Sequence, residues 1–194
     1  MGLRGRTCIA GPGLFFATTS TVDWKDWFST SDNLQRLQCI LFDTVRIKRA
    51  VLMGYVLMPD HVHLLLGTET GGAGLAAFMH SFKVISAKSL NPGGGGIWQD
   101  RFDDLLVASE DQFRVKLAYI HRNPVKAGLA EIETDWLFSS ARFWADLGTS
   151  DVLTKDFAWM DDNVGAVVPG AHTRHRRLAW APDGTETRRP RGTI

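Results

Sequence analysis

Several stretches of the chain are rich in apolar and β-branched residues, the pattern that predicts β-strands. Pro59-Asp60 interrupts this pattern between two of the stretches and signals a turn or a bulge. We expect a bent strand there rather than a hairpin, because a two-residue Pro-Asp link is not a favoured hairpin turn. The predicted strands lie at residues 14–22, 50–58, 61–66 and about 103–108.

Three other stretches repeat apolar residues every three or four positions, which is the spacing of a helical face. The first helix should begin near residue 31. The second should cover about residues 75–90, before Asn91-Pro92 and a run of glycines. Ser109 and Gln112 form a capping box that predicts the start of the third helix.

The third predicted helix carries Tyr119 and Asn123 one turn apart, on a different line from its apolar face. It should end between residues 121 and 123, because Pro124 disfavours helical geometry in the residue before it. From the pattern alone, Tyr119 is a boundary tyrosine with a buried ring and a hydrated hydroxyl.

The order strand, helix, strand, strand, helix, strand, helix predicts an α+β fold. We expect a ferredoxin-like sandwich with an antiparallel sheet of four to five strands and helices packed on one face. The polar face of the central strand and the last helix could then meet. The predicted organisation is a lead-in at residues 1–13, a folded domain at 14–148 and a C-terminal extension at 149–194.

Composition fits an ordinary globular protein, because 44% of the 194 residues are hydrophobic and 22% are charged. No apolar run approaches the roughly 20 residues that span a bilayer, and the N-terminus lacks a signal-peptide pattern, so we expect a cytoplasmic protein without membrane partners. The net charge is +1, but six arginines after residue 171 face only two acids. This basic tail is either a phosphate-binding segment or a solvated, disordered end.

His61 and His63 are the first candidate functional residues. Because side chains alternate along a strand, both imidazoles should point to the same face of the sheet, where they could converge on one metal ion. The alternative is a structural role, because a histidine on a strand is more often a hydrogen-bonded structural residue. The His-x-His pattern alone therefore leaves both interpretations open.

Motifs further along the chain make the pattern more specific. The residues YVLMPDHVHLLL (55–66) precede IWQDRF (97–102), which precedes YIHRNPVKAGLA (119–130) and WLFSSARFW (136–144). In this combination and order, the chain resembles the HUH single-tyrosine transposases of insertion sequences, and is most similar to the REP-associated tyrosine transposases. The resemblance covers about residues 14–144. The segment RFDDLL departs from it, because relatives often carry an aromatic residue and then Asp-His there.

The resemblance implies a DNA nicking and joining enzyme that uses a divalent metal, Mg²⁺ or Mn²⁺. In this reading His61 and His63 are metal ligands and Tyr119 is the nucleophile that forms a 5′-phosphotyrosine. Asn123 would complete the metal shell at a position where insertion-sequence relatives often have Gln. The Asn-Pro pair could instead serve to cap and end the helix.

The implied substrate is single-stranded DNA with a palindromic hairpin such as a REP element, handled by a nucleoid-associated monomer or homodimer. Single strands are held by aromatic platforms and basic grooves. For Trp98 the alternative is a core tryptophan. The candidate DNA-binding residues are Lys83, Lys88, Trp98, Arg101, His121, Arg122 and Lys126.

Three other functions fit parts of the same pattern. An inactive or domesticated relative would bind repeat hairpins as a regulator and form no covalent adduct. A rolling-circle initiator or relaxase would share the His-x-His and tyrosine chemistry, although no second tyrosine lies near Tyr119. A metal hydrolase that uses only the two histidines would cleave with water as the nucleophile.

Overall fold

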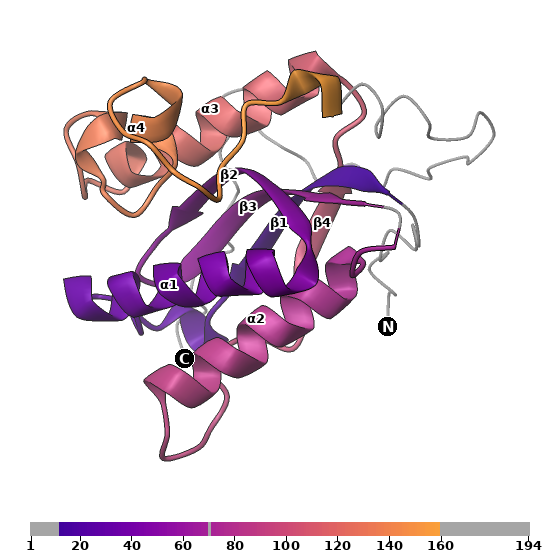
Figure 1. Ribbon diagram of the computed structural model, residues 1–194. Helices are drawn as coiled ribbons and strands as arrows, with labels where there is room; N and C mark the ends of the chain where they lie inside the picture. The colour runs from indigo at the N-terminus through magenta and orange to yellow at the C-terminus, as the bar shows by residue number, and fades with distance from the viewer. Residues whose placement is uncertain (1–11, 70, 160–194) are drawn as a thin grey trace, which may run out of the picture.

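The structure is a computed structural model that describes residues 12–69 and 71–159. Its centre is a four-stranded sheet in which every neighbouring pair is antiparallel (Figure 1). The strand order is β2-β3-β1-β4, and a helix lies between β1 and β2 and between β3 and β4, which is the ferredoxin-like arrangement. The predicted fold class is therefore confirmed. The strands are β1 (Gly13–Ser20), β2 (Ala50–Leu57), β3 (His61–Thr68) and β4 (Asp103–Leu106).

Helices cover both faces of the sheet (Figure 1). On one face, α1 (Ser31–Lys48) and α2 (Leu75–Leu90) form the expected helical layer over Val62 and Leu64 of β3. The prediction that all helices pack on one face is wrong for α3 (Glu110–Lys126). This helix lies on the opposite face of the sheet, together with the short α4 (Ala141–Trp144). The helix α3 lies there because its apolar residues pack against the strand side chains that point away from α1 and α2.

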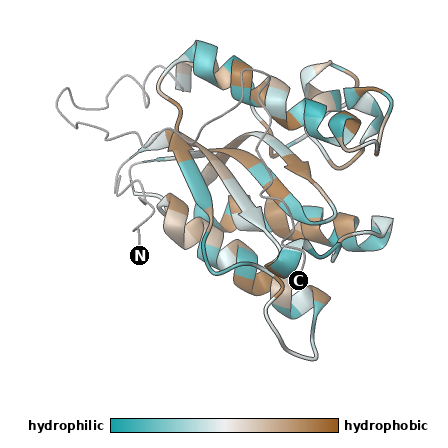
Figure 2. Ribbon diagram, turned by 180° about the vertical axis from the view of Figure 1, so that it is seen from behind, coloured by the Kyte–Doolittle hydropathy of each residue, from teal (hydrophilic) through white to brown (hydrophobic). Residues whose placement is uncertain are grey.

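This second core follows from the alternation of side chains along buried strands. Phe16 of β1 and Leu65 of β3 point away from α1 and α2, and pack with Phe113 and Ile120 of α3. Hydrophobic residues accordingly occur on the strands and on the helices of both layers (Figure 2). A strand with two covered faces leaves no solvated side, so a polar residue on β3 has to find a buried partner.

The link between β2 and β3 corrects the sequence prediction, because these strands form an antiparallel hairpin and not one bent strand. Leu57 pairs with Val62, and Met58 N donates to His61 O at 2.8 Å. The Pro59-Asp60 turn is supported from outside the hairpin. The carbonyl oxygens of these two residues accept hydrogen bonds from the backbone N–H groups of the loop after β1, at 3.0 and 2.8 Å. Tertiary bonds thus stabilise a turn that the local sequence does not favour.

The end of α3 is a second correction. Ser109 caps its start as predicted, accepting from Gln112 N at 3.2 Å. At the other end, the helix continues through Pro124 to Lys126 and not only to residues 121–123. A proline lacks one N–H group, and the last turn still closes by a 3.0 Å bond from Ala127 N to Asn123 O. A proline and the residue before it are both disfavoured inside a helix, and the packing of α3 outweighs these preferences.

The chain after α3 covers the free edge of β2. A 3₁₀ turn, η2 (Glu133–Asp135), leads to a segment in which Ser140 N donates to Tyr55 O at 2.9 Å. Further along, Thr154 N donates to Leu52 O at 3.1 Å. The described part of the predicted C-terminal extension therefore packs on the domain. The arginine-rich tail and most of the predicted lead-in lie outside the described residues. Within the described ranges, no helix is long and apolar enough to cross a membrane.

Candidate active site

His61 and His63 lie side by side on the face of β3 that points toward α3. Their ring centroids are 4.8 Å apart, and both side chains are buried, with 7% and 1% of their surface exposed. The predicted placement of the two imidazoles on one face is confirmed. Because both imidazoles are buried, each needs hydrogen-bond partners inside the protein.

Each histidine has a partner for one ring nitrogen. The Nδ1 of His61 lies 2.6 Å from a carboxylate oxygen of Asp60, and the Nδ1 of His63 lies 2.8 Å from Thr18 Oγ1. A carboxylate only accepts, so the Nδ1–H of His61 donates to Asp60. This arrangement, in which a carboxylate orients an imidazole through its second nitrogen, is common around metal-binding histidines.

The other nitrogen of His63 stands out. Its Nε2 is buried and has no hydrogen-bond partner among the described residues. Burial, and then the nearby charges of His61 and Lys116, hold the pKa of His63 well below its ordinary value, so the imidazole is neutral. In the tautomer whose Nδ1–H donates to Thr18 Oγ1, the neutral imidazole of His63 offers the Nε2 lone pair to a ligand. The residues present therefore fit a metal ion held between the two rings.

Tyr119 of α3 faces this pair across the second core. Its ring centroid is 5.2 Å from that of His63, and the two rings meet edge to face. Phe16 of β1 stacks on His63 at 5.4 Å and touches Tyr119 edge to face at 5.9 Å, so it fixes both rings. A single chain thus brings together the histidine pair and the tyrosine that the sequence singled out.

Two lysines of α3 surround the tyrosine. The Nζ of Lys126 lies 5.9 Å from the centroid of the Tyr119 ring, and the Nζ of Lys116 lies 4.9 Å from that of Phe16. Partial burial lowers the pKa of Lys116. The sequence reasoning missed Lys116, although its position three residues before Tyr119 places both on one side of a helix.

Asn123 lies one turn beyond Tyr119 on α3 and is half-buried. Among the described residues, no group of three or more His, Cys, Asp or Glu side chains could hold a metal ion. The two histidines therefore need a third ligand of another kind. An amide oxygen such as that of Asn123 is compatible with Mg²⁺ or Mn²⁺.

Trp98 was predicted as a base-stacking residue, but the structure places it in the first core. Only 6% of its surface is exposed, its Nε1 donates to Ser86 Oγ at 2.9 Å, and its ring packs on Phe28 and Phe82. No ring face is left for a base. The core role given as the alternative therefore replaces the predicted one.

Two of the predicted DNA-binding cations also have partners inside the protein. His121 Nε2 lies 2.9 Å from Ser140 Oγ, and burial lowers the pKa of this histidine to about 4. A neutral His121 contributes no charge to phosphate binding. Lys83 Nζ donates to the backbone oxygens of Gln99 and Asp100, which ties α2 to the segment before β4.

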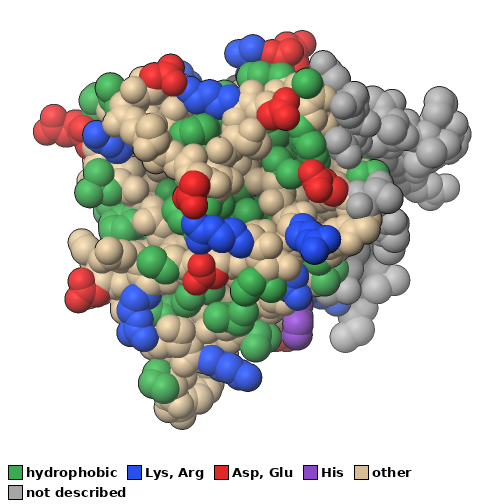
Figure 3. Space-filling model, viewed as in Figure 1, with side chains coloured by type: hydrophobic (Ala, Val, Ile, Leu, Met, Phe, Trp, Pro, Cys, Tyr) green, Lys and Arg blue, Asp and Glu red, His purple; other side chains and the backbone are tan. Residues whose placement is uncertain are grey.

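The other predicted DNA-binding residues remain at the surface. Lys88, Arg101, Arg122 and Lys126 are exposed, and Arg122 lies 3.6 Å from a carboxylate oxygen of Glu133. The face shown in Figure 3 has Lys and Arg interspersed with Asp and Glu. The charge on this face is therefore mixed and does not form a single basic stripe.

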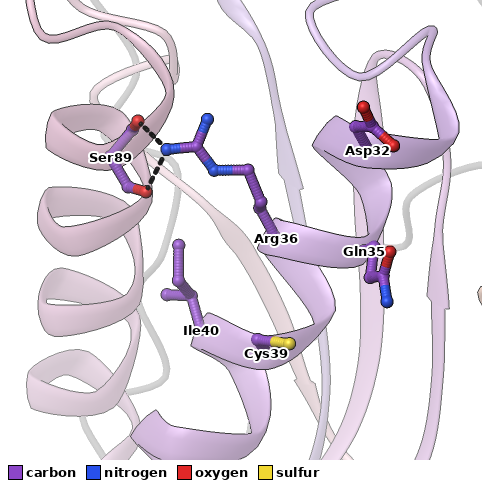
Figure 4. A pocket seen from close by; sticks show the side chains of 6 residues that line it. All are labelled: Asp32, Gln35, Arg36, Cys39, Ile40 and Ser89. Atoms are coloured by element: carbon purple, nitrogen blue, oxygen red, sulfur yellow. Dashed lines mark hydrogen bonds between the residues drawn. The ribbon is translucent and has the colours of Figure 1, made fainter.

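A hollow lies between α1 and α2 (Figure 4). Arg36 crosses it and donates to the backbone oxygen of Ser89 at 2.9 Å. Because α1 and α2 cover the opposite face of the sheet from His63 and Tyr119, this hollow is separate from the candidate active site. Its lining residues are Asp32, Gln35, Arg36, Cys39, Ile40 and Ser89.

Comparisons with known proteins agree with the geometry. Residues 21–123 match the family described as "Transposase IS200 like". A putative REP-associated tyrosine transposase of Haemophilus influenzae is 30% identical over 140 residues, covering 66% of this chain and 79% of the relative. A REP-associated tyrosine transposase of Escherichia coli is 24% identical over 128 residues, covering 66% of this chain and 76% of the relative.

A solved structure supports the same fold. It is that of a REP-associated tyrosine transposase bound to a REP hairpin, and it superposes with a TM-score of 0.64 at 20% sequence identity. The match covers 80% of this chain and 98% of that one. At this identity the match supports the arrangement of strands and helices.

Proposed function

The chain belongs to the IS200-like transposase family, and we propose that it nicks and rejoins single-stranded DNA through a covalent bond between Tyr119 and a 5′ phosphate. The observation that carries the proposal is the contact between Tyr119 and His63, whose ring centroids are 5.2 Å apart. The buried Nε2 of His63 has no hydrogen-bond partner among the described residues, so the proposed nucleophile lies beside a nitrogen that can bind a metal ion.

The proposed reaction exchanges one phosphodiester for another. The Tyr119 hydroxyl oxygen forms a bond to phosphorus, the bond from phosphorus to the 3′ oxygen breaks, and the phenol proton is balanced by protonation of that 3′ oxygen. A phenol with a pKa of about 10 is a weak nucleophile at neutral pH, so a nearby positive charge has to favour the phenolate. Reversal by a 3′ hydroxyl rejoins the strands without a further energy source.

His61 and His63 would hold the divalent ion, Mg²⁺ or Mn²⁺, through Nε2, with Asn123 as the third protein ligand. When bound there, the ion would polarise the non-bridging oxygens of the scissile phosphate and stabilise their charge in the transition state. Asp60 and Thr18 orient the two rings from behind, because they bond the Nδ1 atoms.

The proposed substrate is a single strand that carries a palindromic hairpin. Support comes from the relatives, which are named REP-associated transposases, and from the solved relative bound to a REP hairpin. Four exposed cations would contact the phosphates, and they are Lys88, Arg101, Arg122 and Lys126. Because Tyr119 and His63 belong to one chain, we propose that a monomer cuts with its own tyrosine.

A denaturing gel with hairpin-bearing single strands and Mn²⁺ tests this function. A 3′-labelled strand should shift to the mass of the protein, whereas a 5′-labelled strand should yield a shorter free fragment. Tyr119→Phe should remove both products. The chain has only one other tyrosine, so Tyr55→Phe is a matched control, because Tyr55 is buried and bonded to Gln38.

The same gel separates the alternatives. Binding without cleavage in the parent protein would favour a hairpin-binding regulator. Cleavage without a shifted 3′-labelled product would favour a hydrolase that uses water. Full adduct formation in EDTA, or in a His63→Ala variant, would contradict the metal role of the histidines.

A further inference from the structure

Trp24 lies at the edge of the histidine pair. It belongs to neither hydrophobic core, and the proposed reaction gives it no role. It ends the short 3₁₀ turn η1 (Val22–Trp24), directly after β1. Its ring meets that of His61 edge to face, with centroids 6.2 Å apart. Of the tryptophans in the described residues, Trp24 alone is exposed, with 39% of its surface accessible, so an indole faces solvent next to buried imidazoles.

The backbone holds Trp24 in a conformation that ordinary residues avoid. Asp23 and Trp24 have φ values of 57° and 54°, the left-handed region that is unfavourable for residues other than glycine. Such strain persists only where surrounding bonds fix the backbone, and it clusters at functional sites.

Hydrogen bonds hold the strained turn in place, and one of them joins it to the turn between β2 and β3. Thr21 N donates to Asp60 O at 2.8 Å, and Val22 N donates to Ile97 O at 2.8 Å. Thr21 Oγ1 closes the turn by donating to Lys25 O, also at 2.8 Å. Because the side chain of Asp60 orients His61, one residue anchors both the imidazole and the turn that carries Trp24.

We propose that Trp24 is the platform on which an unpaired base next to the scissile phosphate stacks, so that it sets which phosphate reaches Tyr119. This inference rests on the proposed function, which places a phosphate at His61 and His63. Bases of single strands bind proteins by stacking on exposed aromatic rings, and any base offers a π-face. Trp24 supplies such a ring beside the proposed phosphate site, whereas the ring of Trp98 is buried.

Single abasic sites placed in turn along the DNA strand test the stacking contact. The affinity of the Tyr119→Phe protein is measured, so that cleavage plays no part in the result. One position flanking the cut should weaken binding by about tenfold to a hundredfold when its base is removed. In the Tyr119→Phe protein, the additional substitution Trp24→Leu should weaken binding of the intact strand to a similar extent. Removing the base at that one position should then cause no further loss of affinity.

Trp24→Phe should restore most of the affinity and the sensitivity to the abasic position, because it restores an aromatic ring. If Trp24 only supports His61, Trp24→Leu would weaken Mn²⁺ binding and leave the pattern of abasic sensitivity unchanged, which overturns the inference. Mn²⁺ affinity without DNA is therefore measured for each variant.

The outcomes also separate this inference from the proposed function. An adduct on Tyr119 with an abasic pattern that does not depend on Trp24 overturns the stacking role alone. A pattern that depends on Trp24, in a parent protein that forms no adduct, overturns the chemistry and keeps the stacking role. Absence of DNA binding overturns both.

Discussion

The Nδ1 of His63 lies 2.8 Å from Thr18 Oγ1, and these two residues face each other in register across the central strand pair β1 and β3. Thr18 is itself buried. The bond fixes the rotation of the imidazole, whose ring centroid lies 5.2 Å from that of Tyr119. A short hydroxyl side chain on one strand thus orients the proposed metal ligand on its neighbour.

Thr18→Val should weaken binding of Mn²⁺ by roughly tenfold to a hundredfold, the usual effect of losing a residue that orients a ligating histidine. Valine has nearly the same shape, so the fold should persist while the hydrogen bond is lost. Thr18→Ser keeps the hydroxyl and serves as the control. Titration with Mn²⁺ followed by electron paramagnetic resonance measures the affinity, and equal affinity in all three proteins would contradict the orienting role.

Lys116→Met should slow adduct formation by roughly tenfold to a hundredfold, because it removes a positive charge close to the rings of Phe16 and Tyr119. The affinity for the DNA hairpin should change less than the rate. Single-turnover gels measure the rate of adduct formation. Lys116→Arg should retain much of it. Lys48→Met, in the last turn of α1 on the opposite face of the sheet, should leave the rate of the parent protein.

His121 should make the protein less stable in weak acid. Burial lowers its pKa from 6.5 to about 4 in the folded chain. Above pH 6.5 the side chain is neutral in both states, and its contribution to stability is complete. As the pH falls from 6.5 toward 4, only the unfolded chain gains the proton, so the free energy of unfolding decreases, by roughly 3 kcal/mol at most.

Urea unfolding of the parent and of His121→Gln at several pH values measures this contribution. Other buried histidines such as His63 destabilise both proteins in acid, so only the difference between the two proteins is informative. The parent should lose more stability than the variant between pH 6.5 and 4. Parallel curves would show that His121 has the same pKa in both states.

Gly67→Ala should loosen the segment after α4. A Cβ at this position would lie 2.2 Å from Trp159 Cη2, so the indole has to leave its place on β3. We expect a loss of about 1–3 kcal/mol, the usual cost of overpacking, seen as a lower melting temperature and faster proteolysis near residue 159. Gly93→Ala, with only a contact at 4.0 Å, is the control. In a Trp159→Ala background, Gly67→Ala should cost less.

Local patterns determined much of this protein. The alternation along residues 61–66 placed His61 and His63 on one face, and the spacing of apolar residues gave α2 within its observed bounds. The Ser109 cap located the start of α3. These features depend on residues close together in the sequence, so periodicity and capping rules suffice to predict them.

The tertiary structure decided which partners these residues meet. The β2–β3 hairpin depends on hydrogen bonds from the loop after β1, and α3 extends through Pro124 because its packing outweighs a local preference. Two tryptophans show the same limit. Trp98 is enclosed by residues of other elements, whereas Trp24 faces solvent beside His61, and composition alone does not distinguish them. Burial depends on elements far apart in the chain, so only the packed fold fixes which ring a DNA base could reach.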